Sequence, residues 1–185
     1  MIIESCDIGL VKTKFFWTKP KTWLSVFVRF FINIWNVLSG DGVIPYNHAV
    51  VFVKSDGIMW VYEAKAEGIV KSRLLEWKFD PTVDKAIGLH PIFDFNKDIF
   101  ELNCKANLGL KYDFKATLFH QSIRQLTNET VWIGAKKKAQ REMNCSEFPA
   151  YLFWLSTKKS IFGNWYMVDP EDLFDTDKFT IYKIK

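Results

Sequence analysis

The fold is decided by the stretch His48-Ala49-Val50-Val51-Phe52-Val53, Lys54-Ser55-Asp56-Gly57, Ile58-Met59-Trp60-Val61-Tyr62-Glu63-Ala64. Its two apolar runs are rich in β-branched and aromatic residues, which favour strands. Asp56-Gly57 lies between the runs, and this dipeptide is typical of a two-residue hairpin turn of the primed type. The stretch therefore predicts an antiparallel hairpin over residues 48–64.

The turn also determines which side chains share a face of the hairpin. With Asp56-Gly57 as the loop, Val50 lies opposite Glu63. Because side chains alternate along a strand, His48 lies on the face of Val50 and is a diagonal neighbour of Glu63. Diagonal neighbours are about 7–8 Å apart at the backbone, a distance that long side chains can bridge. A three-residue loop would shift the register by one and separate the two side chains.

An imidazole and a carboxylate that meet in an otherwise apolar hairpin have two interpretations. In the first, His48 and Glu63 form a structural hydrogen bond at the edge of a sheet. In the second, Glu63 orients the imidazole of His48 and favours its charged form, which makes the imidazole a better base.

A cysteine lies at a predicted helix start in Asn144-Cys145-Ser146-Glu147-Phe148-Pro149. Proline is tolerated in the first turn of a helix but not deep inside it, so the helix begins close to Cys145. Asn144, Cys145 or Ser146 is the capping residue. In each case the thiol lies beside unpaired backbone N–H groups and the positive end of the helix dipole, an environment that favours the thiolate and an oxyanion. The alternative is an inert cysteine, the interpretation that we give to Cys6 and Cys104.

The rest of the pattern predicts strands, then helices, then strands again, which is typical of an α+β domain with an antiparallel sheet packed against helices. Further strands are expected at residues 8–14, 69–75, 165–168 and 178–184, with a turn at 169–172. Helices are expected at residues 23–38, 112–126, 130–141 and 146–155. Residues 85–102 give a mixed pattern. A chain of 185 residues is typical of one domain, which we expect to span residues 1–185.

Composition excludes several classes of protein. The apolar share of 49% and the aromatic share of 17% argue against disorder, and a net charge of +4 gives little support for binding nucleic acid. Three cysteines without zinc-ligand spacing predict no disulfide framework, metal or cofactor. Because no signal peptide is evident near residue 1, a cytoplasmic location is expected.

Residues 23–38 are strongly apolar and carry one narrow polar stripe on a helix, formed by Ser25, Arg29, Asn33 and Asn36. A spanning helix is disfavoured because Arg29 would cost about 3 kcal/mol at the bilayer centre. The segment is expected to be either an interior helix or an interfacial helix that makes a peripheral membrane contact.

Several short motifs together resemble one family. Their order is Cys6-Asp7-Ile8-Gly9-Leu10-Val11, Asn47-His48-Ala49-Val50-Val51, Val61-Tyr62-Glu63-Ala64, Leu108-Gly109-Leu110-Lys111-Tyr112-Asp113-Phe114, Asn144-Cys145-Ser146-Glu147 and Val168-Asp169-Pro170-Glu171-Asp172-Leu173. This order resembles the circularly permuted branch of the NlpC-type papain-like cysteine hydrolases, the YiiX- and YaeF-like proteins, in which the histidine strand precedes the cysteine helix. The chain departs from the family pattern in lacking the glycine before Asp7 and in having Glu171 in place of a glycine.

The resemblance implies a permuted papain-like fold and a Cys-His-Glu triad. It implies Cys145 as the nucleophile, His48 as general base and acid, and Glu63 as the group that orients the imidazole. The backbone N–H of Cys145 would be one oxyanion donor. We take Tyr46, on the His48 face two residues earlier, as a candidate for the second donor.

The leading functional expectation is a cysteine hydrolase that acts on an amide, ester or thioester through an acyl-enzyme intermediate. The resemblance implies a substrate among peptides, acyl groups and lipid-linked amides or esters. One alternative is an acyltransferase on the same fold, which would exclude water from the acyl-enzyme. Another is a non-catalytic module that binds lipid or a partner through residues 23–38.

Overall fold

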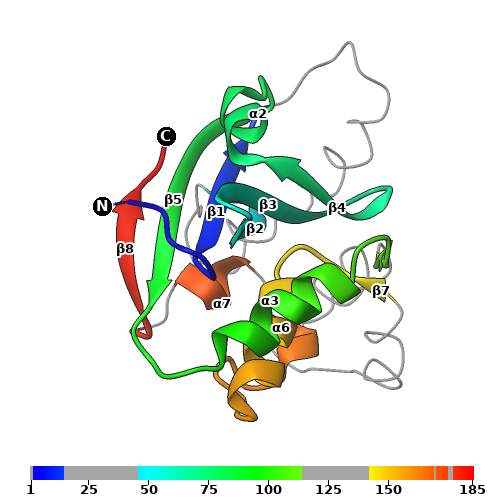
Figure 1. The fold of residues 1–185 in the computed structure, drawn as a ribbon, viewed down its shortest axis with the longest axis vertical. Coiled ribbons are helices and arrows are strands. Elements are labelled where there is room, and N and C mark those ends of the chain that lie inside the picture. Colours follow the sequence, from blue (N-terminus) through cyan, green and yellow to red (C-terminus); the bar gives the residue numbers. More distant parts are fainter. Residues whose placement is uncertain (1, 15–45, 114–141, 169, 175–176) are drawn as a thin grey trace, which may run out of the picture.

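The computed structural model describes residues 2–14, 46–113, 142–168, 170–174 and 177–185, which form a mixed α+β structure (Figure 1). Its main sheet has six strands in the order β4-β3-β2-β1-β5-β8, and every neighbouring pair is antiparallel. The strands are β1 (Ile8–Thr13), β2 (His48–Ser55), β3 (Ile58–Lys65), β4 (Gly68–Arg73), β5 (Val83–Pro91) and β8 (Phe179–Lys183). The expected antiparallel sheet is therefore present.

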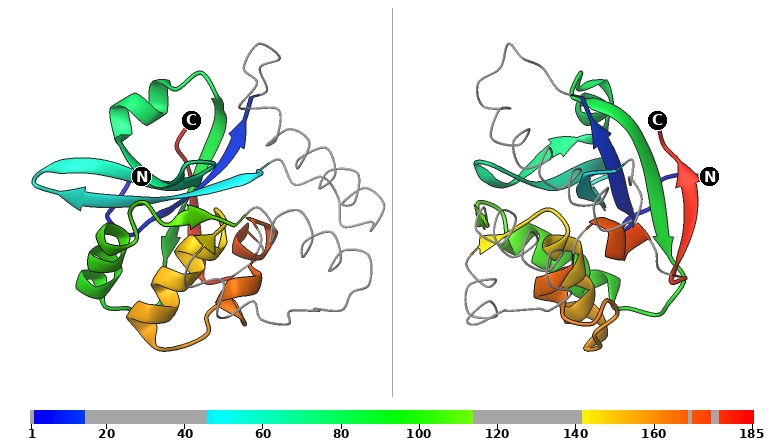
Figure 2. Two further views of the ribbon diagram at one scale, coloured as in Figure 1. Left: turned by 90° about the vertical axis from the view of Figure 1, so that its right-hand side faces the viewer. Right: turned by 180° about the vertical axis from the view of Figure 1, so that it is seen from behind.

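Helices cover both faces of this sheet (Figure 2). On one face α3 (Lys97–Ala106) and α6 (Glu147–Thr157) lie side by side, with the short α7 (Pro170–Phe174) next to them. On the other face lies the single short helix α2 (Leu74–Phe79), whose Trp77 is buried against the sheet. The sheet is therefore the middle layer of the described structure.

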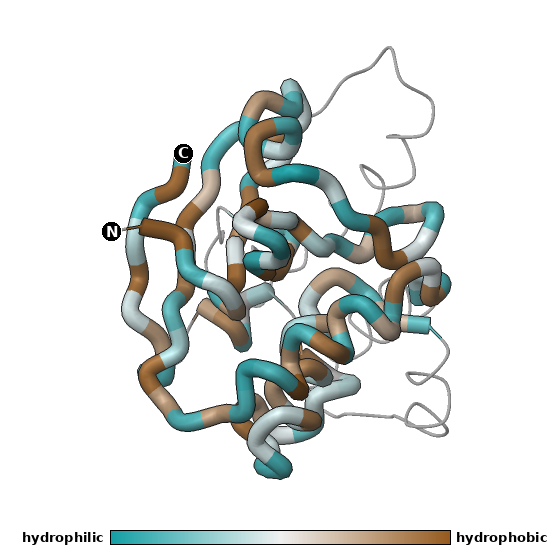
Figure 3. The backbone as a smooth tube through the Cα atoms, viewed as in Figure 1, coloured by the Kyte–Doolittle hydropathy of each residue, from teal (hydrophilic) through white to brown (hydrophobic). Residues whose placement is uncertain are grey.

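The central strand β2 is apolar from Ala49 to Val53, and both of its faces are buried there. Val51 and Val53 belong to the core beneath α3 and α6. Val50 and Phe52 belong to the core beneath α2, where the rings of Phe52 and Trp77 meet edge to face with centroids 5.6 Å apart. The edge strand β8 is less apolar: hydrophobic and hydrophilic segments follow one another along it (Figure 3), and of its residues Phe179 and Tyr182 are buried.

Several predicted elements differ from the structure. Residues 165–168 were expected to form a strand, but Trp165–Met167 is a short 3-10 helix (η2), because the ring of Trp165 packs on Tyr151 and Trp154 of α6. Residues 169–172 were expected to form a turn, but α7 begins at Pro170, since proline fits the first position of a helix.

The predicted boundaries also shift at two other places. The expected strand at residues 69–75 ends at Arg73, where α2 begins. Residues 111–112, the latter expected to start a helix, form strand β6 (Lys111–Tyr112), which pairs in parallel with β7 (Glu142–Met143). The mixed stretch at 85–102 resolves into the end of β5 and the start of α3, and the side chain of Asn96 caps α3 by accepting the Ile99 N–H.

The predicted helices at residues 23–38 and 130–141, and most of the one at 112–126, lie outside the described residues. In the part of the chain that the structure covers, no helix has both the length and the apolar character needed to cross a membrane.

Candidate active site

The hairpin of β2 and β3 has the register that its turn predicts. Ser55 pairs with Ile58 and Val50 pairs with Glu63. Asp56 and Gly57 both have positive φ, at 53° and 78°, as a primed two-residue turn requires. His48 at the start of β2 and Glu63 near the end of β3 therefore project from the same face.

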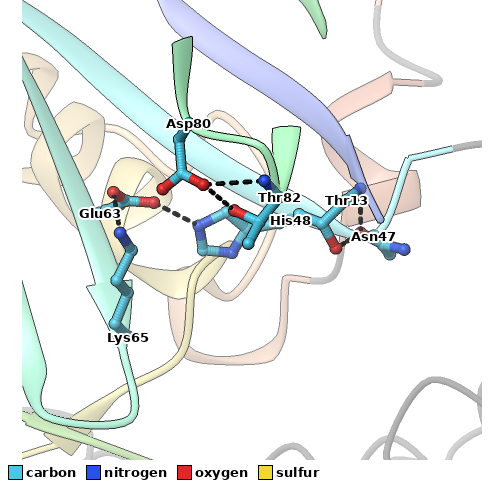
Figure 4. A network of polar contacts seen from close by, with 7 residues as sticks. All are labelled: Thr13, Asn47, His48, Glu63, Lys65, Asp80 and Thr82. Atoms are coloured by element: carbon cyan, nitrogen blue, oxygen red, sulfur yellow. Dashed lines mark hydrogen bonds and ion pairs between the residues drawn. The ribbon is translucent and has the colours of Figure 1, made fainter. Parts of the chain in front are cut away.

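The imidazole of His48 and the carboxylate of Glu63 meet directly, as Figure 4 shows. Nε2 of His48 lies 3.1 Å from Oε2 of Glu63, and both side chains are largely buried. The other carboxylate oxygen, Oε1, lies 2.6 Å from Nζ of Lys65. One ring nitrogen of His48 is thus engaged by Glu63, which leaves Nδ1 for a partner on the opposite side.

That partner is Cys145, whose thiol interacts with the imidazole of His48, so that each group shifts the pKa of the other. This interaction joins residues that are far apart in sequence, at the start of β2 and just before α6. Cys145 is only 7% exposed and lies in the core cluster between the sheet and α6. The structure therefore brings Cys145, His48 and Glu63 into one continuous polar chain.

The backbone before α6 is fixed by Asn144, which settles the choice among the three capping candidates. Its Oδ1 accepts hydrogen bonds from the N–H groups of Ser146 and Glu147, at 3.0 Å and 2.8 Å, and from the Ser146 hydroxyl. The Asn144 N–H in turn donates to the carboxylate of Glu147 at 2.9 Å. This reciprocal arrangement is a capping box, although the regular helix starts at Glu147. Cys145 is held in the turn that the box encloses.

The capping box also limits which backbone groups can act on a substrate. The N–H groups of Ser146 and Glu147 are satisfied by Asn144 and are not free to bind an oxyanion. The N–H groups of Ala49 and of Cys145 itself act on the sulfur and help to lower the pKa of the thiol. Of the helix-start donors expected from the sequence, the Cys145 N–H is therefore the one that remains at the thiol.

These contacts determine the protonation states of Cys145 and His48. Burial lowers the pKa of His48, but the hydrogen bonds to Cys145 and Glu63 outweigh burial and raise that pKa to about 9. Burial raises the pKa of the Cys145 thiol, but the hydrogen bond and charge of His48 outweigh it and lower that pKa below its ordinary value. Both shifts favour a thiolate beside an imidazolium at neutral pH.

The pKa of Glu63 reflects the same network. Burial raises it, but the hydrogen bond and charge of His48, together with the charge of Lys65, outweigh burial and lower it. Glu63 is thus an ionised carboxylate at neutral pH and a counter-charge for the imidazolium.

The other two cysteines have a different setting. Cys6 and Cys104 are fully buried free thiols in the core. Burial, with the charge of Glu101, raises the pKa of Cys6 to about 12, and burial raises the pKa of Cys104 well above its ordinary value. Neither thiol is activated in the way that Cys145 is.

Tyr46, the candidate for the second oxyanion donor, is half-buried and packs against Phe174 of α7, with ring centroids 6.0 Å apart. Within the described structure, its hydroxyl makes no hydrogen bond to Cys145 or His48.

Two features of the polar structure were not predicted from the sequence. The first is Lys65, although its place two residues after Glu63 on the same face was a usable signal. The second is a separate network at the other end of β1, where Asp7 bonds His90 of β5 and Tyr182 of β8. No local signal joins these three residues, since β1, β5 and β8 are far apart in sequence.

Comparison with solved structures places this fold beside a known one. The chain resembles the crystal structure of YiiX, a metalloprotein from Escherichia coli O157:H7, with a TM-score of 0.60. The match covers 96% of this chain and 95% of that one. The chain has a YiiX-like fold. Sequence identity is 13%, so the likeness concerns the fold alone.

Comparisons by sequence give no further relative. No model of a protein family matches the chain, and no curated protein matches it either.

The metal content of YiiX raises the question whether the residues here could hold a metal ion. Among the residues that the structure describes, no group of three or more His, Cys, Asp or Glu side chains could do so. His48, Glu63 and Cys145 are engaged with one another, and the pair of Asp7 and His90 offers two ligands only. These donor sets do not fit a metal centre.

Proposed function

We propose that the protein is a cysteine hydrolase that cleaves an amide, ester or thioester through an acyl-enzyme on Cys145. The observation that carries this proposal is the continuous chain of Cys145, His48 and Glu63, in which a thiol of lowered pKa meets an imidazole of raised pKa. A nucleophile, a base and a group that orients the base are the parts that such chemistry needs.

In the proposed reaction the thiol proton passes to His48 and the thiolate attacks the substrate carbonyl carbon. A C–S bond forms, and the leaving group departs with the proton that His48 returns. Water then gives a proton to His48 and its hydroxyl to the acyl carbon. The C–S bond breaks, Cys145 regains its proton, and the acid is released.

Glu63 would hold the imidazole in one orientation and stabilise its charged form during both steps. The backbone N–H of Cys145 would turn from its own sulfur towards the developing oxyanion, where its contribution to the rate is largest. Tyr46 is our candidate for a second donor, because it lies two residues before His48 and is half-buried beside α7.

The order of the elements supports a finer assignment of the fold. Strand β2, which carries His48, precedes in sequence the turn before α6, which carries Cys145. Residues of both segments contribute to the core between the sheet and α6. We therefore propose that this YiiX-like fold is a permuted papain-like fold of the NlpC type. Its substrates would be peptides, acyl groups or lipid-linked amides and esters.

The experiment that tests the proposal is mass spectrometry of the intact protein after incubation with a panel of acyl esters, thioesters and amides. The expected result is an adduct of one acyl group on Cys145, followed by release of the free acid. Cys145→Ala and His48→Ala should both abolish turnover, because a nucleophile and its base act as a unit. Cys104→Ala is the matched control and should leave turnover intact; the reverse pattern would overturn the proposal.

The same experiment separates the alternative functions. An adduct that persists in water and disappears only when an amine or alcohol acceptor is added identifies an acyltransferase. The absence of any adduct, combined with co-sedimentation with lipid vesicles, identifies a non-catalytic lipid-binding module.

A further inference from the structure

We propose that Lys65 is a positioning residue for this site: its ammonium group holds the carboxylate of Glu63 in place and thereby keeps the imidazole of His48 aimed at the thiol of Cys145. This inference rests on the proposed function and extends its machinery from three side chains to four. Lys65 lies two residues after Glu63 on β3, so both side chains project from one face of the strand.

The contact is needed because Glu63 is a buried carboxylate with two oxygens to satisfy. Its side chain is 4% exposed, and Oε2 is taken by His48. Oε1 forms an ion pair with Nζ of Lys65, 2.6 Å away, and has no other partner among the described residues. Without Lys65 this oxygen would be buried without a partner, which is costly for a charged group. The carboxylate would then rotate or take up a proton.

The backbone that carries Lys65 is held firmly. Lys65 pairs with Gly68 across the turn between β3 and β4. Gly68 has φ +116°, and a Cβ at this position would lie 2.6 Å from the carbonyl oxygen of Leu110. The Ile69 N–H donates to the same carbonyl at 2.8 Å, and the Gly109 N–H donates to Ile69 O at 2.8 Å. The turn between β3 and β4 is thus hydrogen-bonded to the loop before β6. These bonds hold the backbone of Lys65 in a fixed position.

Among the residues that the structure describes, few charged groups act on Glu63. His48 faces it from β2 and Lys65 from β3 itself, while Cys145, from the turn before α6, acts through His48. The Lys65 side chain is 38% exposed and therefore reaches solvent, so its replacement leaves no buried cavity. Removal of the ammonium group should make Glu63 easier to protonate, since a neighbouring cation favours the carboxylate. A neutral Glu63 no longer stabilises the imidazolium, and the thiolate then loses its counter-charge at a higher pH than in the parent protein.

The test is the pH dependence of Cys145 alkylation by iodoacetamide, followed by peptide mass spectrometry. We compare the parent protein with Lys65→Met, which keeps the aliphatic length, and Lys65→Arg, which keeps the charge. Lys54→Met on the adjacent strand β2 is the matched control, because Lys54 forms no ion pair among the described residues. Lys65→Met should raise the midpoint of the acidic limb by about half a pH unit or more, whereas Lys65→Arg and Lys54→Met should keep the parent midpoint.

The outcomes separate this inference from the proposed function. A low parent midpoint that Lys65→Met leaves unchanged overturns the role of Lys65 alone, and so does an equal shift with Lys54→Met. A parent midpoint equal to that of an ordinary thiol overturns both proposals. A shift with Lys65→Met, reversed in Lys65→Arg, supports the role of Lys65 even if no substrate of the panel acylates Cys145, a result that would count against the hydrolase.

Discussion

Asn144 and Glu147 bond each other twice across the turn that holds Cys145. The Glu147 N–H donates to Oδ1 of Asn144 at 2.8 Å, and the Asn144 N–H donates to Oε2 of Glu147 at 2.9 Å. Both residues are buried, so the turn has little freedom to move. This box places the thiol against the imidazole of His48 and, because it satisfies two N–H groups at the helix start, also determines which donors remain at the site.

Asn144→Ala should therefore lower both the stability of the protein and the reactivity of the Cys145 thiol. Loss of a capping side chain costs about 1–2 kcal/mol of unfolding free energy, measured by urea denaturation. Cys145 alkylation at neutral pH should also slow, because the sulfur is no longer held at His48. Asn96→Ala, which removes the cap of α3, is the matched control: it should cost similar stability and leave alkylation unchanged. Equal alkylation rates in the two variants would show that the box is only a helix cap.

Glu63→Gln should shift the alkaline limb of the pH–rate profile with an acylating substrate. In the parent protein this limb should lie near pH 9, because His48 must stay protonated to act as the acid and its pKa is raised to about 9. The glutamine removes the counter-charge, so the pKa of His48 falls and the limb moves down by about 1–2 pH units. The exposed Glu67→Gln serves as control. A limb that does not move would exclude a charge-stabilising role for Glu63.

Iodoacetamide at neutral pH should label Cys145 well ahead of Cys6 and Cys104. The Cys145 thiol has a lowered pKa beside His48, whereas burial raises the pKa of Cys6 to about 12 and that of Cys104 far above its ordinary value. Peptide mass spectrometry gives the rate for each cysteine in the folded protein. Equal labelling of all three cysteines would contradict the assignment of Cys145 as the nucleophile.

Asp7→Asn should destabilise the fold without affecting the thiol. Asp7 is fully buried and accepts the Glu4 N–H at 2.9 Å and the Tyr182 hydroxyl, and it lies 2.7 Å from Nδ1 of His90. Disruption of such a buried network costs about 2–4 kcal/mol. Thermal unfolding should show the loss, while the pH profile of Cys145 alkylation stays that of the parent. An unchanged melting temperature would mean that the network adds nothing to stability.

The hairpin and the approach of His48 to Glu63 could be predicted from the sequence because both depend on local geometry. A two-residue turn at Asp56-Gly57 sets the register of the hairpin, and the alternation of side chains along the strands places His48 and Glu63 on the same face. The contact of Cys145 with His48 is different, since no local pattern joins a turn before α6 to the start of β2. It was expected only because the order of the motifs resembles a known family.

Other features required long-range packing that the sequence does not display. Trp165 is an aromatic residue, a type that is common in strands, yet its ring packs on α6 and the segment forms the 3-10 helix η2. The pairing of β5 with β8 brings Tyr182 to Asp7, although these two residues lie near opposite ends of the chain. Local alternation places Lys65 on the face of Glu63, but the burial that makes their contact matter depends on the whole sheet.

The most direct test of the Cys145–His48 ion pair is the ultraviolet absorbance of the thiolate as a function of pH, taken as the difference between the parent protein and Cys145→Ala. If the ion pair forms, the difference is already present at neutral pH and His48→Ala abolishes it there. A difference that appears only above the ordinary pKa of a thiol, about 8.5, in both the parent and His48→Ala backgrounds would contradict the ion pair.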